Sequence, residues 1–374
     1  MKMGKSTTKI LIVGGGTGGH VFPGIAVAQN IQNDSSVEIL FIGGTQRMER
    51  EWVENYGFHF AEIAAVPFPR RKIIKWISFP IYFLMSIQRA WKIFKKFNPD
   101  AVFSTGGYVS APAALVAVLK RIPLAIFEPN VVPGLTTRFF QFFSRKIFVG
   151  FEETMKWFSK KKTSWNGIPI RQEILNFSKA KAIKTFNLQP NVPVLLVLGG
   201  SQGARNLNHA AVQAIQFMDQ GDHALQVIFM TGRSEFQMRM DQLEKCSIKV
   251  MARMFIQNIQ DAYAVADLVI SRAGALTCGE ILVSQVPSIL IPYPYASNHQ
   301  EKNARALEKM GASVVILEKN LNGEELAKNI LGILSNSDCQ NKMKQAARLG
   351  AKRDAGMRIA ESILQLTKNK RKIA

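Results

Sequence analysis

The chain has 374 residues, 47% of them hydrophobic and 20% charged, which excludes extended disorder and exceeds what one hydrophobic core usually organises. With 48 Lys and Arg against 27 Asp and Glu, the net charge is +21, so a polyanionic partner is expected: nucleic acid, an anionic bilayer or a phosphorylated substrate. The three cysteines lie too far apart for a disulfide framework or a metal site, which favours a reducing compartment.

Short apolar, β-branched runs alternate with helical stretches, a pattern typical of parallel sheets covered by helices on both faces. In the first half, strands are predicted at Ile10–Val13, Glu38–Ile42, Ala101–Ser104, Leu124–Phe127 and Lys146–Val149. The alternation restarts after a Pro/Gly crossover at Asn166–Arg171, with strands at Val194–Leu198, Gln226–Met230, Ile248–Ala252, Leu268–Ser271 and Ser288–Ile291. Helices are predicted near the end at Ser337–Leu349 and Arg353–Leu366, on either half. The run Ile10–Val13 is too short for a signal-peptide core, so we expect no export.

One pattern occurs twice. Residues 10–20 and 194–205 both read as an apolar strand, a glycine-rich turn and the start of a helix. The repeat predicts an α/β fold with two Rossmann-like domains, each opened by such a turn.

The first turn runs from Gly14 to Gly19 and ends at His20. Backbone amides and the helix dipole favour an anion at such a turn. No acidic residue ends the second strand, which disfavours a dinucleotide cofactor. The dipole also favours a neutral His20 that is able to accept a proton. A turn without ligand and a structural histidine remain the alternatives.

The second turn, Gly199–Arg205, is a comparable phosphate cradle in which the Ser201 hydroxyl adds a donor. It also matches G-x-S-x-G, the turn that carries a hydrolase nucleophile. That alternative requires a downstream acid and histidine, and His299 is the only histidine well downstream.

Two further turns follow strands. Gly106, Gly107 and Tyr108 form a second possible anion cradle in the first half. In the second half, Ser271–Thr277 leads to Glu280, whose carboxylate is able to accept both hydroxyls of a ribose, unless it is an ordinary helix acid. There is no D-x-D pair, P-loop lysine or zinc-spaced cluster, so no metal or cofactor is expected, and cations such as Arg171 would meet a diphosphate instead.

The segment 66–99 contains no acidic residue and many cations and aromatic residues. Its apolar stretch Ile73–Ile87 would be roughly 22 Å long as a helix, too short to span a bilayer. A helix or hairpin lying on an anionic membrane fits better, with Trp76, Phe79 and Phe83 on the membrane face. A core-packed helix is one alternative. Nucleic acid is another, but no nucleic-acid module accompanies the segment.

Taken together, these motifs resemble the MurG family, peripheral membrane glycosyltransferases of bacterial peptidoglycan synthesis. The resemblance covers nearly the whole chain, in the family's order: Gly14–His20, Ser104–Ser110, Glu128–Gly134, Gly167–Arg171, Gly199–Arg205, Ser271–Glu280 and His299–Ala304. Seven segments in order are far more specific than one glycine turn.

The resemblance implies a GT-B fold, with two Rossmann-like domains facing across a cleft. Residues 1–168 would form the acceptor and membrane-binding domain, and 169–349 the domain that binds the UDP-sugar. The C-terminal helix, about 350–374, would pack back on the first domain. The implied reaction transfers N-acetylglucosamine, with inversion, from UDP-N-acetylglucosamine to the 4-hydroxyl of undecaprenyl-diphosphoryl-N-acetylmuramoyl-pentapeptide, and binds the donor without a metal.

The resemblance also assigns residues. The first candidate for the base is His20 and the second is Glu128. Substrate-binding positions would be Thr17, Gly18, Gly19, Asn130, Arg171, Ser201, Ile256, Gly274, Ala275, Leu276, Thr277, Glu280 and Gln300. The acceptor diphosphate would meet Gly106, Gly107 and Tyr108.

The expected location is the cytoplasmic face of the bacterial inner membrane, with anionic lipid and the two substrates as partners and no nucleic acid. Other cell-wall synthesis proteins stay open as partners. Two rival functions also stay open: a synthase of diacylglycerol glycosides, and a membrane-associated sensor of nucleotide sugars that catalyses nothing.

Overall fold

The computed structural model describes residues 7–32, 34–66, 74–200, 203–221, 223–295 and 299–373, without the side chains of 47, 74–77 and 369–373. The chain divides into two compact units. The first contains Met1–Arg171 and Lys352–Ala374, and the second contains Gln172–Ala351. Within the described ranges, no helix combines the length and the apolar character that a transmembrane span requires.

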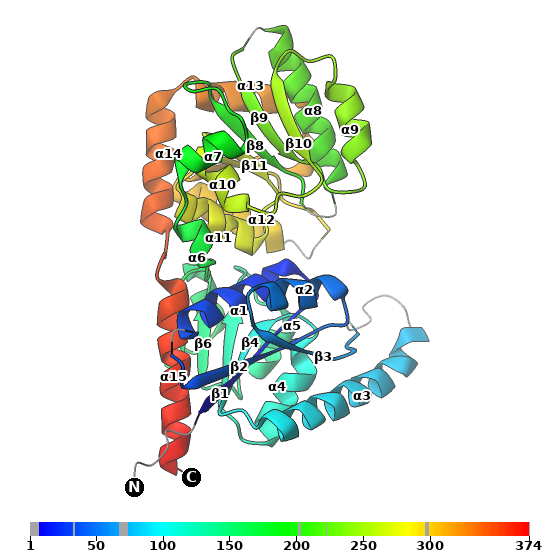
Figure 1. The fold of residues 1–374 in the computed structure, drawn as a ribbon, viewed down its shortest axis with the longest axis vertical. Helices are drawn as coiled ribbons and strands as arrows, with labels where there is room; N and C mark the ends of the chain where they lie inside the picture. The colour runs from blue at the N-terminus through cyan, green and yellow to red at the C-terminus, as the bar shows by residue number, and fades with distance from the viewer. Residues whose placement is uncertain are drawn as a thin grey trace. The chain divides into compact units, whose positions relative to one another are not determined.

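In the first unit, the described residues form a seven-stranded sheet of order β3-β2-β1-β4-β5-β6-β7, in which neighbouring strands are parallel (Figure 1). The strands are β1 (Thr8–Gly14), β2 (Val37–Gly43), β3 (His59–Glu62), β4 (Ala101–Gly106), β5 (Leu124–Glu128), β6 (Lys146–Val149) and β7 (Thr163–Trp165). The helices are α1 (Gly18–Ile31), α2 (Arg47–Asn55), α3 (Ile74–Phe97), α4 (Ser110–Leu119), α5 (Leu135–Phe140), the 3₁₀ turn η1 (Glu152–Trp157) and α15 (Ala355–Ile373).

Helices cover both faces of this sheet because its central strands are apolar on both sides. Leu11 and Val13 of β1 join a core that includes Phe94 of α3 and Ala113 of α4. On the other face, α1 packs against β1 and β4, and α15 packs against α1. The C-terminal helix therefore completes the unit that contains the N-terminal strands.

The second unit has a six-stranded parallel sheet of order β10-β9-β8-β11-β12-β13 among its described residues. Its strands are β8 (Val194–Leu198), β9 (Gln226–Met230), β10 (Lys249–Arg253), β11 (Leu268–Ser271), β12 (Ser288–Leu290) and β13 (Ser313–Val315). Its helices are α6 (Gln172–Leu175), α7 (Lys179–Thr185), α8 (Arg205–Gln220), α9 (Phe236–Leu243), α10 (Ile259–Val265), α11 (Ala275–Ser284), α12 (His299–Met310), η2 (Glu318–Asn320), α13 (Gly323–Leu334) and α14 (Ser337–Gly350).

Both sheets have a point at which the strand order reverses. In the first, β1 lies between β2 and β4, and in the second, β8 lies between β9 and β11. Ligands of open parallel sheets bind beyond the carboxyl ends of the strands at such a point. The first and second glycine turns follow β1 and β8, so the topology places each turn at the position where a ligand is expected.

Candidate functional site

Two glycine turns meet in the first unit because β1 and β4 are neighbours. The turn after β1 carries Gly14, and a Cβ atom at Gly14 would collide with the Thr105 hydroxyl of β4. That hydroxyl donates a hydrogen bond of 2.6 Å to the backbone oxygen of His20. The glycine turn after β1 and the Gly106–Tyr108 turn after β4, which were predicted separately from the sequence, thus lie side by side.

His20 is half-buried in the first turn of α1. Its Nδ1 lies 2.8 Å from the backbone oxygen of Thr105. Since a carbonyl oxygen only accepts, Nδ1 carries the hydrogen and Nε2 of the neutral ring keeps its lone pair. The fold therefore fixes the tautomer in which Nε2 is able to accept a proton.

Gly107 makes room beside that ring. Its φ of +82° strains any other residue, and a Cβ there would lie 2.6 Å from the Gly15 oxygen and 3.1 Å from Cδ2 of His20. Gly106 also has a positive φ, of +89°. Without side chains, these glycines leave the edge of the imidazole that carries Nε2 unobstructed on this side.

A buried carboxylate holds the first glycine turn. Glu49 of α2 is only 1% exposed, and it accepts hydrogen bonds from the amides of Gly16 at 2.6 Å and Gly44 at 2.8 Å. Burial and, to a lesser degree, the Glu49 charge raise the pKa of Tyr108. Sequence reasoning missed Glu49, because an acid in the first turn of a helix is too common to stand out.

Glu128 and Asn130 lie together at the end of β5. The Glu128 carboxylate, 2% exposed, accepts from the Asn130 amide at 3.1 Å, the Asn130 side chain at 3.2 Å and the Gly134 amide at 3.0 Å. Both carboxylate oxygens are therefore engaged in holding the loop that leads into α5.

The remaining predicted residues of this unit lie near the start of α1. Thr17 is the exposed N-cap of that helix, and Gly18 and Gly19 are its half-buried first residues. The Arg171 guanidinium lies 4.1 Å from the centroid of the Phe22 ring and donates to the Tyr56 hydroxyl at 3.4 Å. Phe22 stands two residues after His20, so Arg171 is anchored to the same helix as the candidate base.

In the second unit, the corresponding turn follows β8. Ser201 lies outside the described residues. A Cβ at Gly199 would collide with the Asn208 side chain, and one at Gly232 with the backbone of Gly203. The flanks of this turn are thus closely packed against α8 and the loop after β9.

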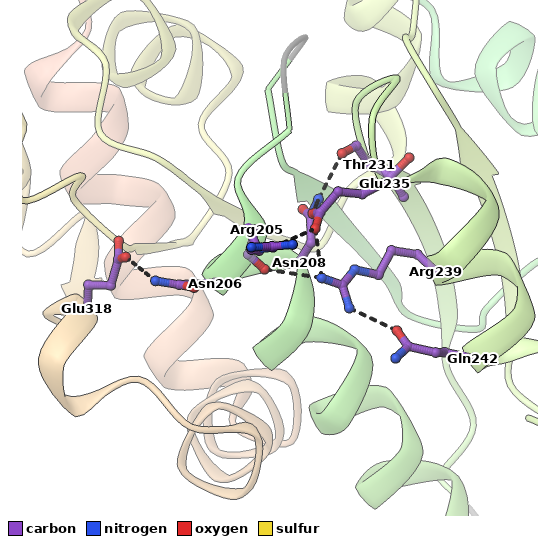
Figure 2. Close-up of polar contacts among 8 residues, drawn as sticks. All are labelled: Arg205, Asn206, Asn208, Thr231, Glu235, Arg239, Gln242 and Glu318. Atoms are coloured by element: carbon purple, nitrogen blue, oxygen red, sulfur yellow. Dashed lines mark hydrogen bonds and ion pairs between the residues drawn. The ribbon is translucent and has the colours of Figure 1, made fainter.

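A buried polar network supports that turn (Figure 2). The Asn208 side chain donates to Glu235 at 2.6 Å and to the Thr231 carbonyl at 2.8 Å. Glu235 also forms an ion pair of 2.9 Å with Arg239, which is 3% exposed and donates to Gln242 at 2.9 Å. Sequence reasoning missed these residues, because an i,i+4 acid–base pair such as Glu235 and Arg239 is common on helices and Asn208 lies on a separate element.

The other predicted turn of this unit begins α11. Gly274 is its N-cap, and Ala275, Leu276 and Thr277 form its first turn. Glu280, buried in the next turn, accepts from the Tyr263 hydroxyl at 3.2 Å. This turn follows β11, which pairs in parallel with β8. Both candidate phosphate-binding turns of this unit therefore lie beyond the carboxyl ends of neighbouring strands.

Two predicted residues occupy other loops of the second unit. Ile256 is buried after β10. The Gln300 side chain, in the first turn of α12, accepts from the Tyr293 amide at 3.0 Å. The assignment of Ile256 and Gln300 to donor binding stays a prediction.

Helix α3 has two apolar faces. Phe79 and Phe83 stack at 5.6 Å between ring centroids and are half-buried, lining a groove beside α4 and α5. The strongly exposed residues are Ile81, Leu84 and Met85, which we call the apolar ridge; Ile81 is 61% exposed. The Trp76 side chain lies outside the described residues. The segment is a helix, and the assignment of Trp76, Phe79 and Phe83 to a membrane face stays a prediction.

Among the described residues, no group of three or more His, Cys, Asp and Glu side chains is placed to hold a metal ion.

Residues 10–149 match the glycosyltransferase family 28 N-terminal domain, and residues 194–359 match the family 28 C-terminal domain.

Two bacterial relatives carry the name UDP-N-acetylglucosamine–N-acetylmuramyl-(pentapeptide) pyrophosphoryl-undecaprenol N-acetylglucosamine transferase. The relative from Thermoanaerobacter sp. (strain X514) is 39% identical over 96% of this chain and all of its own length. The relative from Thermodesulfovibrio yellowstonii is 38% identical over 97% of this chain and all of its own.

Solved structures agree on the fold. Acinetobacter baumannii MurG superposes with a TM-score of 0.75 at 24% identity, covering 96% of this chain and 99% of its own. The glycosyltransferase of kitacinnamycin gives 0.74 at 15% identity, with the same coverages. The predicted class, two Rossmann-like domains of the GT-B type, is confirmed.

Proposed function

The chain belongs to glycosyltransferase family 28, and from that premise we propose that it transfers N-acetylglucosamine from UDP-N-acetylglucosamine to the muramoyl sugar of undecaprenyl-diphosphoryl-N-acetylmuramoyl-pentapeptide. It is an N-acetylglucosaminyltransferase of peptidoglycan synthesis, the enzyme that converts lipid I to lipid II. The observation that carries the chemistry is the fixed tautomer of His20, at the point where two glycine turns meet.

His20 is the proposed base. The proton of the acceptor 4-hydroxyl moves to Nε2 while the oxygen attacks the anomeric carbon of the donor. The bond from that carbon to the diphosphate oxygen breaks in the same step, and UDP leaves with the electron pair. One in-line displacement inverts the anomeric centre, and the hydrogen bond to Thr105 orients the imidazole for the transfer.

Glu128 has a different proposed role. Its two oxygens accept three hydrogen bonds from its own loop, so the carboxylate is already engaged in holding that loop. We assign Glu128 as a positioning residue that presents Asn130 to the transferred sugar, together with Thr17, Gly18 and Gly19. Gly106, Gly107 and Tyr108 would meet the acceptor diphosphate.

Donor binding is proposed at the turns after β8 and β11. Free amides at the starts of α8 and α11 favour the diphosphate, with Ser201 and Arg171 as additional donors. Gly274–Thr277 and Glu280 would hold the diphosphate and ribose. Ile256 would meet the uracil, and Gln300 the sugar.

Peripheral attachment to the cytoplasmic face of the inner membrane is also proposed. The apolar ridge of α3 is exposed, as are Phe139 and Phe142, the latter by 73%. Arg138, Arg145 and Lys146 are exposed beside those phenylalanines. Apolar side chains flanked by cations bind anionic bilayers, and the net charge of +21 acts in the same direction.

The test is transfer of label. Purified protein is incubated with radiolabelled UDP-N-acetylglucosamine and the lipid-linked muramoyl-pentapeptide, and the lipid fraction is analysed for labelled disaccharide. A parallel reaction supplies diacylglycerol as the acceptor. Labelled disaccharide lipid in the first reaction alone is expected. Its absence while the donor binds would overturn the proposal, and label on diacylglycerol would favour a glycolipid synthase.

A further inference from the structure

An apolar groove of about 380 Å³ lies between α3, α4 and α5 in the described part of the first unit. Its walls include Phe79 and Phe83 of α3, Ala111 and Leu115 of α4, and Phe139 of α5. We call it the α3–α5 groove. The proposed transfer reaction assigns it no role.

The polar end of the groove touches the candidate site. Tyr108 lines the groove, and its ring also lies over the first glycine turn, where a Cβ at Gly16 would come within 2.9 Å of it. Thr136, another lining residue, donates to the Gly107 carbonyl at 3.3 Å. The groove therefore begins at the turn that would meet the acceptor diphosphate.

The other walls of the groove lead to exposed apolar surface. Phe139 lines the groove and is itself strongly exposed, with its ring against Phe140 and Phe143. Phe83 lines it from α3, next in sequence to Leu84 of the apolar ridge. A ligand in the groove would thus have the glycine turns at one end and apolar surface along its length.

We propose that the α3–α5 groove binds the first isoprene units of the polyprenyl chain of the acceptor. This inference rests on the proposed function, because the acceptor carries sugar, diphosphate and polyprenyl chain in that order. The structure provides His20, the Gly106–Tyr108 turn and the groove in the same order. At the packing density of protein interiors, the groove accommodates roughly three isoprene units.

The chain-binding role separates this groove from the membrane-binding face. Phospholipid binding needs exposed apolar residues, which the ridge supplies, whereas the groove is half-enclosed and ends at polar groups. Enclosure lets the protein select the lipid that carries a diphosphate, since an ordinary acyl chain brings no group for Gly107 and Tyr108. The enzyme would then distinguish its acceptor partly by its chain.

The decisive variant fills the groove. Ala111→Trp places an indole in the space, and Leu119→Trp adds the same side chain to α4 at a strongly exposed position outside the groove. Calorimetry compares geranylgeranyl diphosphate with isopentenyl diphosphate as probes. Wild type and Leu119→Trp are expected to bind the longer probe at least about tenfold more tightly, and Ala111→Trp is expected to lose that preference.

Activity provides the second measurement. Acceptors with geranylgeranyl and with isopentenyl chains are compared by kcat/KM in detergent, with the KM for UDP-N-acetylglucosamine as a check on the donor site. Ala111→Trp should lower kcat/KM for the geranylgeranyl acceptor and leave kcat/KM for the isopentenyl acceptor unchanged. Should Ala111→Trp not fold, Leu115→Ala tests the same groove with a smaller change at a half-buried position, with an expected loss of about threefold in kcat/KM for the longer acceptor.

The outcomes are separable. If wild type binds both probes equally, the groove inference is wrong, even if transfer occurs. If neither acceptor is glycosylated but the longer probe still binds more tightly, the proposed function fails and the groove remains a polyprenyl site. If Ala111→Trp lowers binding to phospholipid vesicles without changing the chain preference, the occupant is a membrane acyl chain, and the inference is overturned.

Discussion

The imidazole of His20 donates a hydrogen bond of 2.8 Å to the backbone oxygen of Thr105. The bond joins the first turn of α1 to the end of β4, two segments that are 85 residues apart in sequence. Because the acceptor belongs to the backbone, no side-chain substitution at Thr105 removes it. The orientation of the candidate base therefore depends on the strand order of the sheet.

Replacing His20 by Ala should lower kcat by roughly a hundredfold or more, because the acceptor hydroxyl loses its proton acceptor. The KM for UDP-N-acetylglucosamine should change little. Steady-state transfer of labelled sugar measures both. His59→Ala, at an exposed position of β3, is the matched control and should behave as wild type. Equal turnover by both variants would remove His20 as the base.

Alanine substitutions at two glycines with similar φ angles distinguish the effect of backbone strain from that of a steric clash. Gly57 has a φ of +78° and open space around its Cβ position. Gly107 has a φ of +82°, and a Cβ atom there would lie 2.6 Å from the Gly15 oxygen. Gly57→Ala should cost about 1 kcal/mol of unfolding free energy through strain alone. Gly107→Ala should cost more and also reduce kcat. Urea unfolding with transfer assays measures both effects, and identical losses would show that the close approach is unimportant.

Substitution of Arg239 in the Glu235–Arg239 ion pair tests whether the polar network beside the second glycine turn stabilises the fold. Arg239→Met removes the buried ion-pair partner of Glu235 and leaves only the exposed Arg205, at 4.0 Å, so the unfolding free energy should fall by roughly 3–5 kcal/mol. Donor affinity should fall as well, since Asn208 and Glu235 hold the start of α8.

Lys328→Met, which breaks an exposed ion pair with Glu324, is the control for Arg239→Met and should leave stability within experimental error. Urea unfolding and calorimetric titration with UDP measure the two effects. If Arg239→Met unfolds normally yet binds UDP weakly, the network serves the ligand rather than the fold.

The apolar ridge predicts which residues attach the protein to a membrane. Serine at Ile81, Leu84 and Met85 together should reduce binding to anionic vesicles by about tenfold or more, because three exposed apolar side chains are lost. Donor binding should stay unchanged. Leu349→Ser, at a position 76% exposed on α14, controls for the loss of exposed apolar surface elsewhere. Vesicle co-sedimentation decides, and unchanged binding by the triple variant would exclude the ridge.

Alkaline stability should depend on Cys278. Its thiol is fully buried in α11, and burial raises its pKa from 9.0 to about 12. The folded protein therefore retains a proton that the unfolded chain releases above about pH 9, so stability falls as the pH rises through this window. The slope from this group approaches about 1.4 kcal/mol per pH unit.

Cys278→Ala should flatten the pH dependence between about pH 9 and pH 11 in urea unfolding. Cys339→Ala is the control, because Cys339 is only half-buried, and it should leave the pH dependence of stability unchanged. Parallel pH profiles for the wild type and Cys278→Ala would contradict the assignment.

Central strands were predictable because they are continuous apolar runs. Lys146–Val149 and Val194–Leu198 were predicted with the bounds that the structure has. Three strands were missed: β3, β7 and β13. All three are outermost in their sheets and short, so they need fewer apolar residues and give little periodic signal. Pairing with a neighbour, rather than their own sequence, makes them strands.

The glycine turns were also readable, because few residues other than glycine adopt the backbone that they require. Their supports were not. Glu49 and Glu235 are ordinary acids in sequence, and what distinguishes them is a buried partner far along the chain. On α3, composition showed that apolar and basic residues are combined, but only the helix showed that Phe79 and Phe83 line the groove while Leu84 is exposed.

Helix α15 has a consequence for the order in which the protein is completed during synthesis. It packs on α1, and its residues Ile359 and Ile363 are fully buried. The first unit therefore lacks part of its core until α15 has left the ribosome, whereas all of Gln172–Ala351 has already been made by then. The first unit begins to emerge before the second but is completed after it. The face of α1 that α15 covers therefore stays exposed while the second unit folds.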